Sequence, residues 1–167
     1  IGSVFLVLLS TSLASAHEED TLDPHNATPG LRLELSELPR NSASASPRYR
    51  MRAVGFPHGV IFGVWAQDFG HLFHLVASGF QVDEAGNVVS SSKRSGRGRP
   101  NKPEQITLGP GRYPRGAVWQ VALVSVDKTL RAFTGVIPQP IVARDGPCTV
   151  QLELVSYGGD HFVATGS

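Results

Sequence analysis

The sequence predicts an all-β protein in which antiparallel strands form a sandwich or a barrel. Roughly ten short segments carry apolar residues at the spacing of a strand, and turn residues separate them. No segment after the N-terminal apolar run has a helical period, so the crossover helices of a parallel sheet have no place to form. Hydrophobic residues make up 41% of the 167 residues and charged residues 17%, which is typical of a globular domain.

The chain begins with an apolar segment that ends in a cleavage-type motif. Residues 4–13 (VFLVLLSTSL) carry no charge and are too few to cross a bilayer, which takes about 20 apolar residues. Residues 14–16 (ASA) then match the small-x-small pattern of signal peptidase sites. We therefore expect residues 1–16 to be a signal-peptide helix that lacks its start, because no Met and no basic region precede it. His17 would then open a chain secreted to the medium, the cell surface or the periplasm. A buried core segment is the alternative.

The first predicted strands alternate apolar and polar residues. Residues 17–30 are acidic and show no period, so we expect a flexible lead-in there. In LRLEL at 31–35 the leucines share one face, which is the period of a half-buried strand. In RYRMRAV at 48–54 the three arginines occupy the outward positions and the larger apolar residues the inward ones.

Further strand segments follow, with turns between them. Residues 60–68 (VIFGVWAQD) are apolar on both faces, as in a central strand. The remaining strands before residue 138 are expected at 71–82, 88–92, 106–108, 117–126 and 130–137. Gly, Pro, Asn and Asp mark the turns, as in GFPHG at 55–59 and DEAGN at 83–87.

The C-terminal part repeats the opening pattern after a proline-rich segment. Three prolines in PQPIVARDGP withhold backbone donors from a sheet, so we expect a linker over residues 138–148. The strands TVQLELVS and HFVAT then echo LRLEL and RMRAVGF of the first part. We therefore expect residues 149–167 to be the first two strands of a truncated second module that is loosely attached.

This arrangement resembles the tandem immunoglobulin-like sandwiches of secreted bacterial proteins. The resemblance covers residues 31–167 and is carried by the strand spacing and by turns such as GFPHG and DEAGN. It implies an antiparallel immunoglobulin-like β-sandwich over residues 31–137. It also implies a spacer, adhesion or ligand-binding role within a larger extracellular protein. The cysteine and tryptophan signature of antibody domains is absent, so only the architecture carries over.

Apolar residues at strand period identify the expected core. These residues are Leu33, Leu35, Met51, Phe62, Val64, Trp119, Val121, Leu123, Phe133, Leu152 and Leu154. Two strands alone cannot bury an apolar face. We therefore expect Leu152 and Leu154, in the second module, to be markedly more exposed than Leu33 and Leu35.

The sequence offers no catalytic constellation. A G-x-S-x-G nucleophile turn is absent, the serines lie in polar loops, and acidic residues lie at turns or in the lead-in. Cys148 is the single cysteine, which excludes an internal disulfide and a cysteine-based zinc site. An exported chain without disulfides favours a bacterial source. We therefore expect a module that is not an enzyme and uses no cofactor.

A copper site at the mature N-terminus is the alternative hypothesis. Cleavage after Ala16 would give His17 a free amino group beside its imidazole, and the two can chelate copper together with a second histidine. The candidate partners are His25, His71 and His74. The last two lie three residues apart and so point to opposite faces of a strand, which prevents them from sharing a metal easily.

A basic loop over residues 93–105 is the strongest local charge signal. Its cations are Lys93, Arg94, Arg97, Arg99 and Lys102, and Arg48, Arg50 and Arg52 add a cationic stripe. Such a patch can hold anionic glycans. No aromatic residue interleaves the loop and the net charge is only +1, so nucleic acid is not an expected partner. Extracellular glycans or proteins are the expected partners, and a solvated loop without function is the alternative.

The signal-peptide interpretation predicts where the mature chain begins. We expect exported protein to start at His17, because signal peptidase cuts after small residues such as those at 14 and 16. Intact-mass spectrometry of the exported protein measures this directly. A mature chain that retains residues 1–16 would contradict the interpretation.

Overall fold

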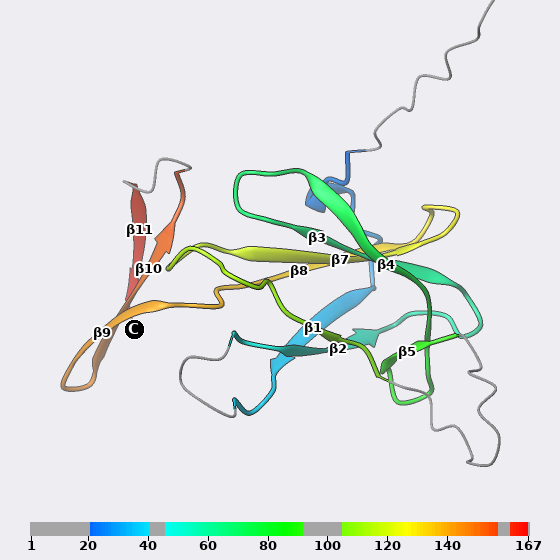
Figure 1. Ribbon diagram of the computed structural model, residues 1–167, viewed down its shortest axis with the longest axis horizontal. Helices are drawn as coiled ribbons and strands as arrows, with labels where there is room; N and C mark the ends of the chain where they lie inside the picture. Colours follow the sequence, from blue (N-terminus) through cyan, green and yellow to red (C-terminus); the bar gives the residue numbers. More distant parts are fainter. Residues whose placement is uncertain (1–20, 41–45, 92–104, 157–160, 167) are drawn as a thin grey trace, which may run out of the picture.

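The structure is all-β, as the sequence predicts, and its strands pair antiparallel (Figure 1). The computed structural model describes residues 21–40, 46–91, 105–156 and 161–166. The predicted signal peptide lies outside these residues. Within them the strands form a three-stranded sheet A, a five-stranded sheet B and a three-stranded sheet C.

Sheet A has the strand order β1-β2-β6. Its strands are β1 (Arg32–Glu37), β2 (Tyr49–Val54) and β6 (Thr107–Leu108). Burial alternates along β2, so that Tyr49, Met51 and Ala53 are buried while the arginines between them are exposed. The predicted inward and outward faces of this strand are confirmed.

Sheet B has the strand order β5-β4-β3-β7-β8. Its strands are β3 (Phe62–Gln67), β4 (Phe73–Val82), β5 (Val88–Ser90), β7 (Trp119–Ser125) and β8 (Arg131–Val136). The apolar segment at 60–68 does supply the central strand, because β3 lies between β4 and β7. Register pairs Val64 with Leu123 and Trp65 with Ala122, so that Val64 is fully buried and Trp65 packs on the outer side of the sheet.

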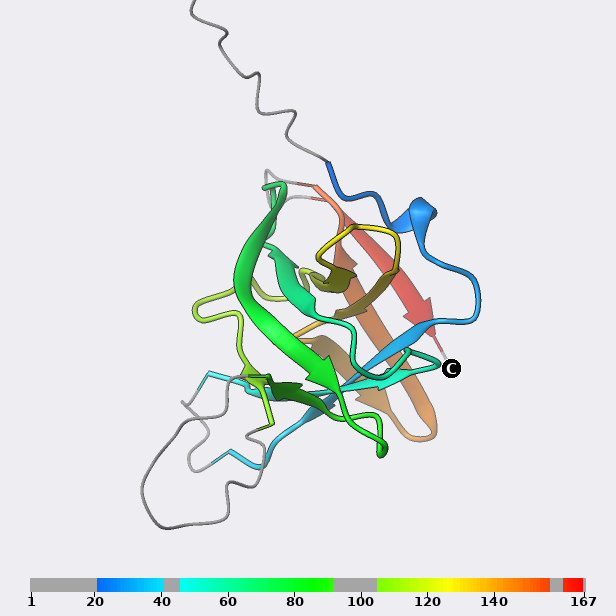
Figure 2. The ribbon, with the colours of Figure 1, turned by 90° about the vertical axis from the view of Figure 1, so that its right-hand side faces the viewer.

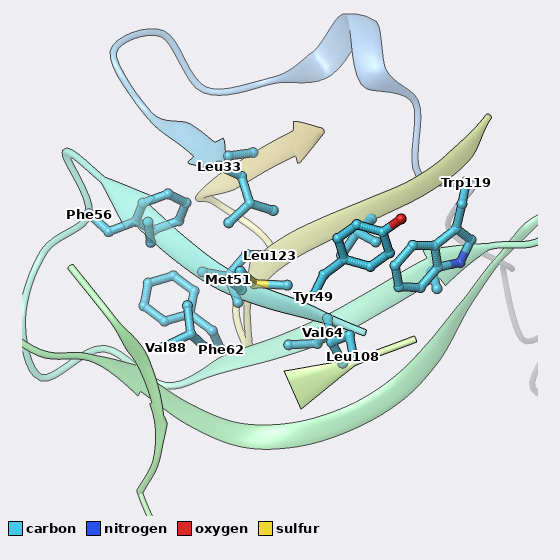
Figure 3. Packing of buried hydrophobic residues seen from close by; sticks show 14 of the residues in the cluster. Leu33, Tyr49, Met51, Phe56, Phe62, Val64, Val88, Leu108, Trp119 and Leu123 are labelled. Carbon is cyan, nitrogen blue, oxygen red and sulfur yellow. The ribbon is translucent and has the colours of Figure 1, made fainter. Parts of the chain in front are cut away.

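Sheets A and B face each other across one apolar core (Figure 3). Eight predicted core residues are buried there: Leu33, Met51, Phe62, Val64, Trp119, Val121, Leu123 and Leu154. Leu35 and Leu152 are only half-buried. Phe133 is half-buried as well and lies on the outer face of sheet B, opposite to the expected side.

The N-terminal segment covers a second apolar cluster on the outer face of sheet B. The cluster contains Leu22, Ala122 and Val124, and Trp65, Phe73 and Phe133 border it. The rings of Phe73 and Phe133 meet edge to face, with centroids 5.6 Å apart. The outer side of β7 is therefore apolar, and burying it favours the docking of the chain segment that precedes β1.

Within the predicted flexible lead-in over residues 17–30, residues 21–30 are described and pack against sheet B, which corrects the prediction for this part. A short 3₁₀ helix, η1 (Pro24–Asn26), lies beside the hairpin of β7 and β8 (Figure 2). The backbone N–H of Thr28 donates to the carbonyl of Arg131 at 2.8 Å, and the Thr28 hydroxyl accepts from the Arg131 N–H at 2.9 Å. The acidic composition of the segment concealed Leu22, the large apolar residue that anchors it.

Sheet C has the strand order β11-β10-β9. Its strands are β9 (Ile141–Asp145), β10 (Cys148–Leu154) and β11 (Phe162–Gly166). The prediction of a linker over 138–148 is therefore wrong for β9, which pairs along its length with β10. Prolines 138, 140 and 147 flank β9 rather than interrupt it, so every residue of the strand keeps its backbone donor. The C-terminal part accordingly has three strands, where the sequence predicted two.

Sheet C is joined to the core through Gly116 and Leu154. The carbonyl of Gly116 accepts a hydrogen bond from the N–H of Leu154 at 2.9 Å. Leu154 is 6% exposed, close to the 5% of Leu33, and Leu152 is half-buried like Leu35. The expectation that the C-terminal leucines would be markedly more exposed is wrong, because β10 closes an end of the core.

The turn at residues 83–87 connects β4 to β5 and also links sheet B to sheet A. The carboxylate of Asp83 accepts hydrogen bonds from the backbone and side-chain N–H groups of Asn87. Gly86 has a φ of +81°, and its carbonyl accepts from the N–H of Ala53 in β2 at 2.7 Å. A Cβ atom on Gly86 would lie 2.7 Å from the Ala53 oxygen, so the approach of the two sheets requires glycine here.

Substituting Gly86 tests this contact between the sheets. Gly86→Ala should lower the free energy of unfolding by about 1–2 kcal/mol for the left-handed backbone and by about 1–3 kcal/mol more for the clash. Gly59→Ala is the matched control, since Gly59 has a φ of +78° and a Cβ atom there would meet nothing within 4 Å. Urea unfolding of both variants measures the difference. Equal losses would show that the Gly86 contact is unimportant.

Candidate functional site

A row of exposed arginines follows the outer side of sheet A. Arg48 precedes β2, and Arg50 and Arg52 lie on it at alternate positions. We call these three residues the cationic face. Arg50 is in register with Ser36 of β1 and with Thr107 of β6, so the row of arginines runs along the central strand of the sheet. The hydrophobic residues between the arginines hold the strand in the core, and this fixes the guanidinium groups outside.

An acidic residue beside the cationic face offsets only part of its charge. The Arg52 guanidinium lies 3.9 Å from the Glu34 carboxylate, and both side chains are more than half exposed. An exposed pair of this kind contributes only about 0–1 kcal/mol, so another anion can replace the Glu34 carboxylate at the Arg52 guanidinium. Arg48 and Arg50 form no ion pair with any described residue.

A polar pocket of about 270 Å³ adjoins the cationic face at Arg48. Its lining residues are Arg48, Phe80, Ser90, Gln105, Ile106 and Thr107. The guanidinium, the two hydroxyls and the amide are groups that hydrogen-bond an anionic oxygen, and the guanidinium adds a charge-assisted bond. The Gln105 amide nitrogen also donates to the side chain of Asn87 at 2.9 Å, which fixes its position.

The predicted basic loop joins the polar pocket through its two ends. The polar pocket is lined by Ser90, which lies shortly before the loop, and by Gln105, which is the last residue of the loop. The five cations of the loop, Lys93, Arg94, Arg97, Arg99 and Lys102, lie outside the described residues.

The histidines singled out by the copper hypothesis do not gather among the described residues. His17 lies outside that part of the chain, and His25 is exposed on η1. His71 is exposed in the turn before β4, and His74 is exposed on β4. Within the described ranges no three His, Cys, Asp or Glu side chains are grouped as a metal site would require.

A second pocket, of about 280 Å³, lies where sheet C meets sheet B, and we call it the joint pocket. It is lined by Gln67, Asp68, Phe69, Gly70, Val118, Gln120, Glu153, Leu154 and Val155. These residues come from the turn between β3 and β4, from the start of β7 and from the end of β10. Sequence reasoning missed the joint pocket, because nothing in the sequence connects Asp68 with Glu153 until sheet C docks.

Tyr113 holds two walls of the joint pocket together. Its hydroxyl donates to the carbonyl of Val118 at 2.8 Å and lies 3.5 Å from the carbonyl of Gln67. Burial raises the pKa of Tyr113 to about 12; the Asp68 carboxylate adds to the rise, and a backbone hydrogen bond from Phe69 opposes it. The folded protein therefore stabilises the neutral, protonated form of the Tyr113 side chain.

Comparison of the chain with family models, curated proteins and solved structures finds no match in any of the three. Among the described residues, no helix combines the length and the apolar composition that crossing a bilayer requires.

Two tyrosines of similar burial give a matched test of the bracing role. Tyr113→Phe should lower the free energy of unfolding by about 1–3 kcal/mol, because a buried hydrogen bond is lost. Tyr49→Phe should be neutral or stabilising, because the buried hydroxyl of Tyr49 has no hydrogen-bond partner among the described residues. Chemical denaturation at neutral pH measures both. Equal effects would contradict the assignment.

The raised pKa of Tyr113 also predicts how the stability of the protein changes at alkaline pH. The pKa of Tyr113 is higher in the folded state, about 12, than the ordinary 10.0. Its contribution is therefore complete below pH 10.0 and is lost as the pH rises toward about 12. Tyr113→Phe should decline less steeply than the parent protein across this window, and parallel declines would count against the pKa shift.

Proposed function

We propose that the chain is a non-catalytic, immunoglobulin-like β-sandwich module of a secreted or cell-surface protein, and that it binds acidic polysaccharides. The observation that carries the proposal is the cationic face, in which Arg50 and Arg52 lie on β2, Arg48 directly precedes it, and the polar pocket adjoins Arg48. The sheets provide the frame for this surface, and the binding chemistry comes from the guanidinium groups.

The strand order supports the immunoglobulin-like assignment. In variable-type immunoglobulin domains, strands A, B and E share one sheet with D, and strands G, F, C, C′ and C″ form the other. Numbered along the chain, β1-β2-β6 corresponds to A-B-E, and β8-β7-β3-β4-β5 corresponds to G-F-C-C′-C″. Sheet A carries no counterpart of strand D among the described residues.

Tyr113 occupies a place that is typical of such domains. Many of them carry a tyrosine near the start of strand F whose hydroxyl binds the backbone. Tyr113 lies between β6 and β7, and its hydroxyl binds the carbonyl of Val118. The partner lies downstream rather than upstream, and the core tryptophan is Trp119 of β7 rather than Trp65 of β3. The strand order of this chain therefore agrees with immunoglobulin domains better than the positions of its tyrosine and tryptophan do.

The geometry of the cationic face suits a repeating anion. Residues at alternate positions of a strand lie about 7 Å apart on the same side, which gives a row of evenly spaced cations. A guanidinium binds carboxylate and sulfate groups through paired hydrogen bonds. An extended acidic polysaccharide presents such groups in sequence, and its terminal or branching unit could enter the polar pocket at Arg48.

The proposed extracellular location of the protein is inferred from the residues that precede the strands. The apolar run at 4–13 and the tripeptide ASA at 14–16 support export of the chain. A polysaccharide-binding role fits that setting, where glycans are abundant on surfaces.

Removing the cationic face tests the proposal. The variant Arg48→Ala/Arg50→Ala/Arg52→Ala should bind heparin and polygalacturonate about tenfold more weakly, since three exposed ion pairs together contribute about 1–3 kcal/mol. The control Arg112→Ala/Arg115→Ala/Arg144→Ala removes the same charge from exposed positions elsewhere. Calorimetric titration measures the binding of both variants. Repeating it at a higher salt concentration shows how much of the binding is electrostatic, because salt screens exposed charges. Equal losses in the two variants would refute a specific face.

A further inference from the structure

The joint pocket has hydrogen-bonding capacity that the protein itself does not use. Asp68, Gln120 and Glu153 line it and are half-buried. The side chains of these three residues form no hydrogen bond or ion pair within the described part of the chain. These polar groups therefore stay available to a ligand, and the open hollow of about 280 Å³ between the two sheets offers room for one.

The backbone holds these groups in a fixed arrangement. Gln67 and Gln120 are register partners on β3 and β7, so both amides project from the same face of sheet B. Asp68 follows directly in the turn, where its carbonyl accepts from the N–H of His71 at 3.0 Å. Glu153 approaches from β10, next to Leu154, whose burial in the core anchors that strand. The groups therefore come from well-packed elements, which favours binding without rearrangement.

The unused capacity consists mainly of acceptors. The two carboxylates, of Asp68 and Glu153, act as hydrogen-bond acceptors. Gln67 already directs its amide nitrogen to the carbonyl of His71, at 2.9 Å, and this leaves its carbonyl oxygen as an acceptor. Gln120 contributes one further acceptor together with its donors. A ligand that complements the joint pocket must therefore be rich in donors and, opposite two carboxylates, positively charged.

The remaining lining residues limit the size and shape of the ligand. Phe69, Val118, Leu154 and Val155 add apolar surface beside the polar groups. A volume of about 280 Å³ accommodates one sugar-sized ring rather than an extended chain. A bare divalent cation fits less well, because calcium takes six to eight oxygen ligands and the described residues hold no cluster of three potential metal ligands here.

We infer that the joint pocket binds an amino sugar unit, with its ammonium group between Asp68 and Glu153. The hydroxyls of the sugar would reach the amide oxygens of Gln67 and Gln120, and its apolar ring face would contact the aliphatic lining. This site is separate from the cationic face on sheet A and selects the opposite charge. The module thus carries one surface for acidic sugars and one pocket for a basic sugar.

Matched sugars and matched variants test the inference on the full chain. We expect D-glucosamine, protonated below neutral pH, to shift the NMR signals of backbone amides at 67–70, 118–120 and 153–155. Asp68→Asn and Glu153→Gln should each weaken this binding about tenfold, because each removes a charge-assisted hydrogen bond. Asp145→Asn, which removes an exposed carboxylate from β9, should leave it unchanged.

The charge selectivity provides the decisive comparison. D-glucose and N-acetyl-D-glucosamine, which lack the ammonium group, should bind about tenfold more weakly than D-glucosamine. Equal or tighter binding of either neutral sugar, shifts that map outside the joint pocket, or an equal loss in Asp145→Asn would each overturn the inference. Thermal unfolding of the two pocket variants within the range of the parent protein shows that a loss of binding does not come from a loss of fold.

Discussion

The alternation of side chains along β2 is the constraint on which both the core and the cationic face depend. Tyr49, Met51 and Ala53 point into the space between sheets A and B, and the arginines between them point outward. A slip of one residue would bury guanidinium groups without partners and expose the apolar ones, at a cost of many kcal/mol. The burial that stabilises the fold therefore also orients the candidate binding surface.

The second organising feature is the junction at Gly116. A side chain there would crowd Leu152 and Leu154 of β10, since a Cβ atom would lie 3.3 Å from one backbone oxygen and 3.4 Å from the next backbone nitrogen. Glycine permits β10 to approach closely enough for Leu154 to enter the core. The joint pocket exists only because sheet C docks in this way, so it depends on the backbone contact of Leu154 with Gly116.

The core also shows where polar groups are tolerated without partners. The hydroxyl of Tyr49 and the indole N–H of Trp119 are buried and have no hydrogen-bond partner among the described residues, and their rings lie 5.9 Å apart. Aromatic packing and burial of a large apolar area outweigh the desolvation of one polar atom on each side chain. Tyr113 contrasts with them, because its hydroxyl is fully used in holding the turn after β3 against the start of β7.

The sequence by itself determined the all-β class, the position of nearly every strand and the inward face of β2, because these follow from local periodicity and turn chemistry. It also identified Arg48, Arg50 and Arg52 as an exposed row. Only the tertiary structure decided what Leu22, Leu154 and the segment 141–145 do, and it alone brought Asp68 and Glu153 to one pocket. Those outcomes depend on which distant apolar surfaces cover one another, and a period read along one strand carries no information about its neighbour.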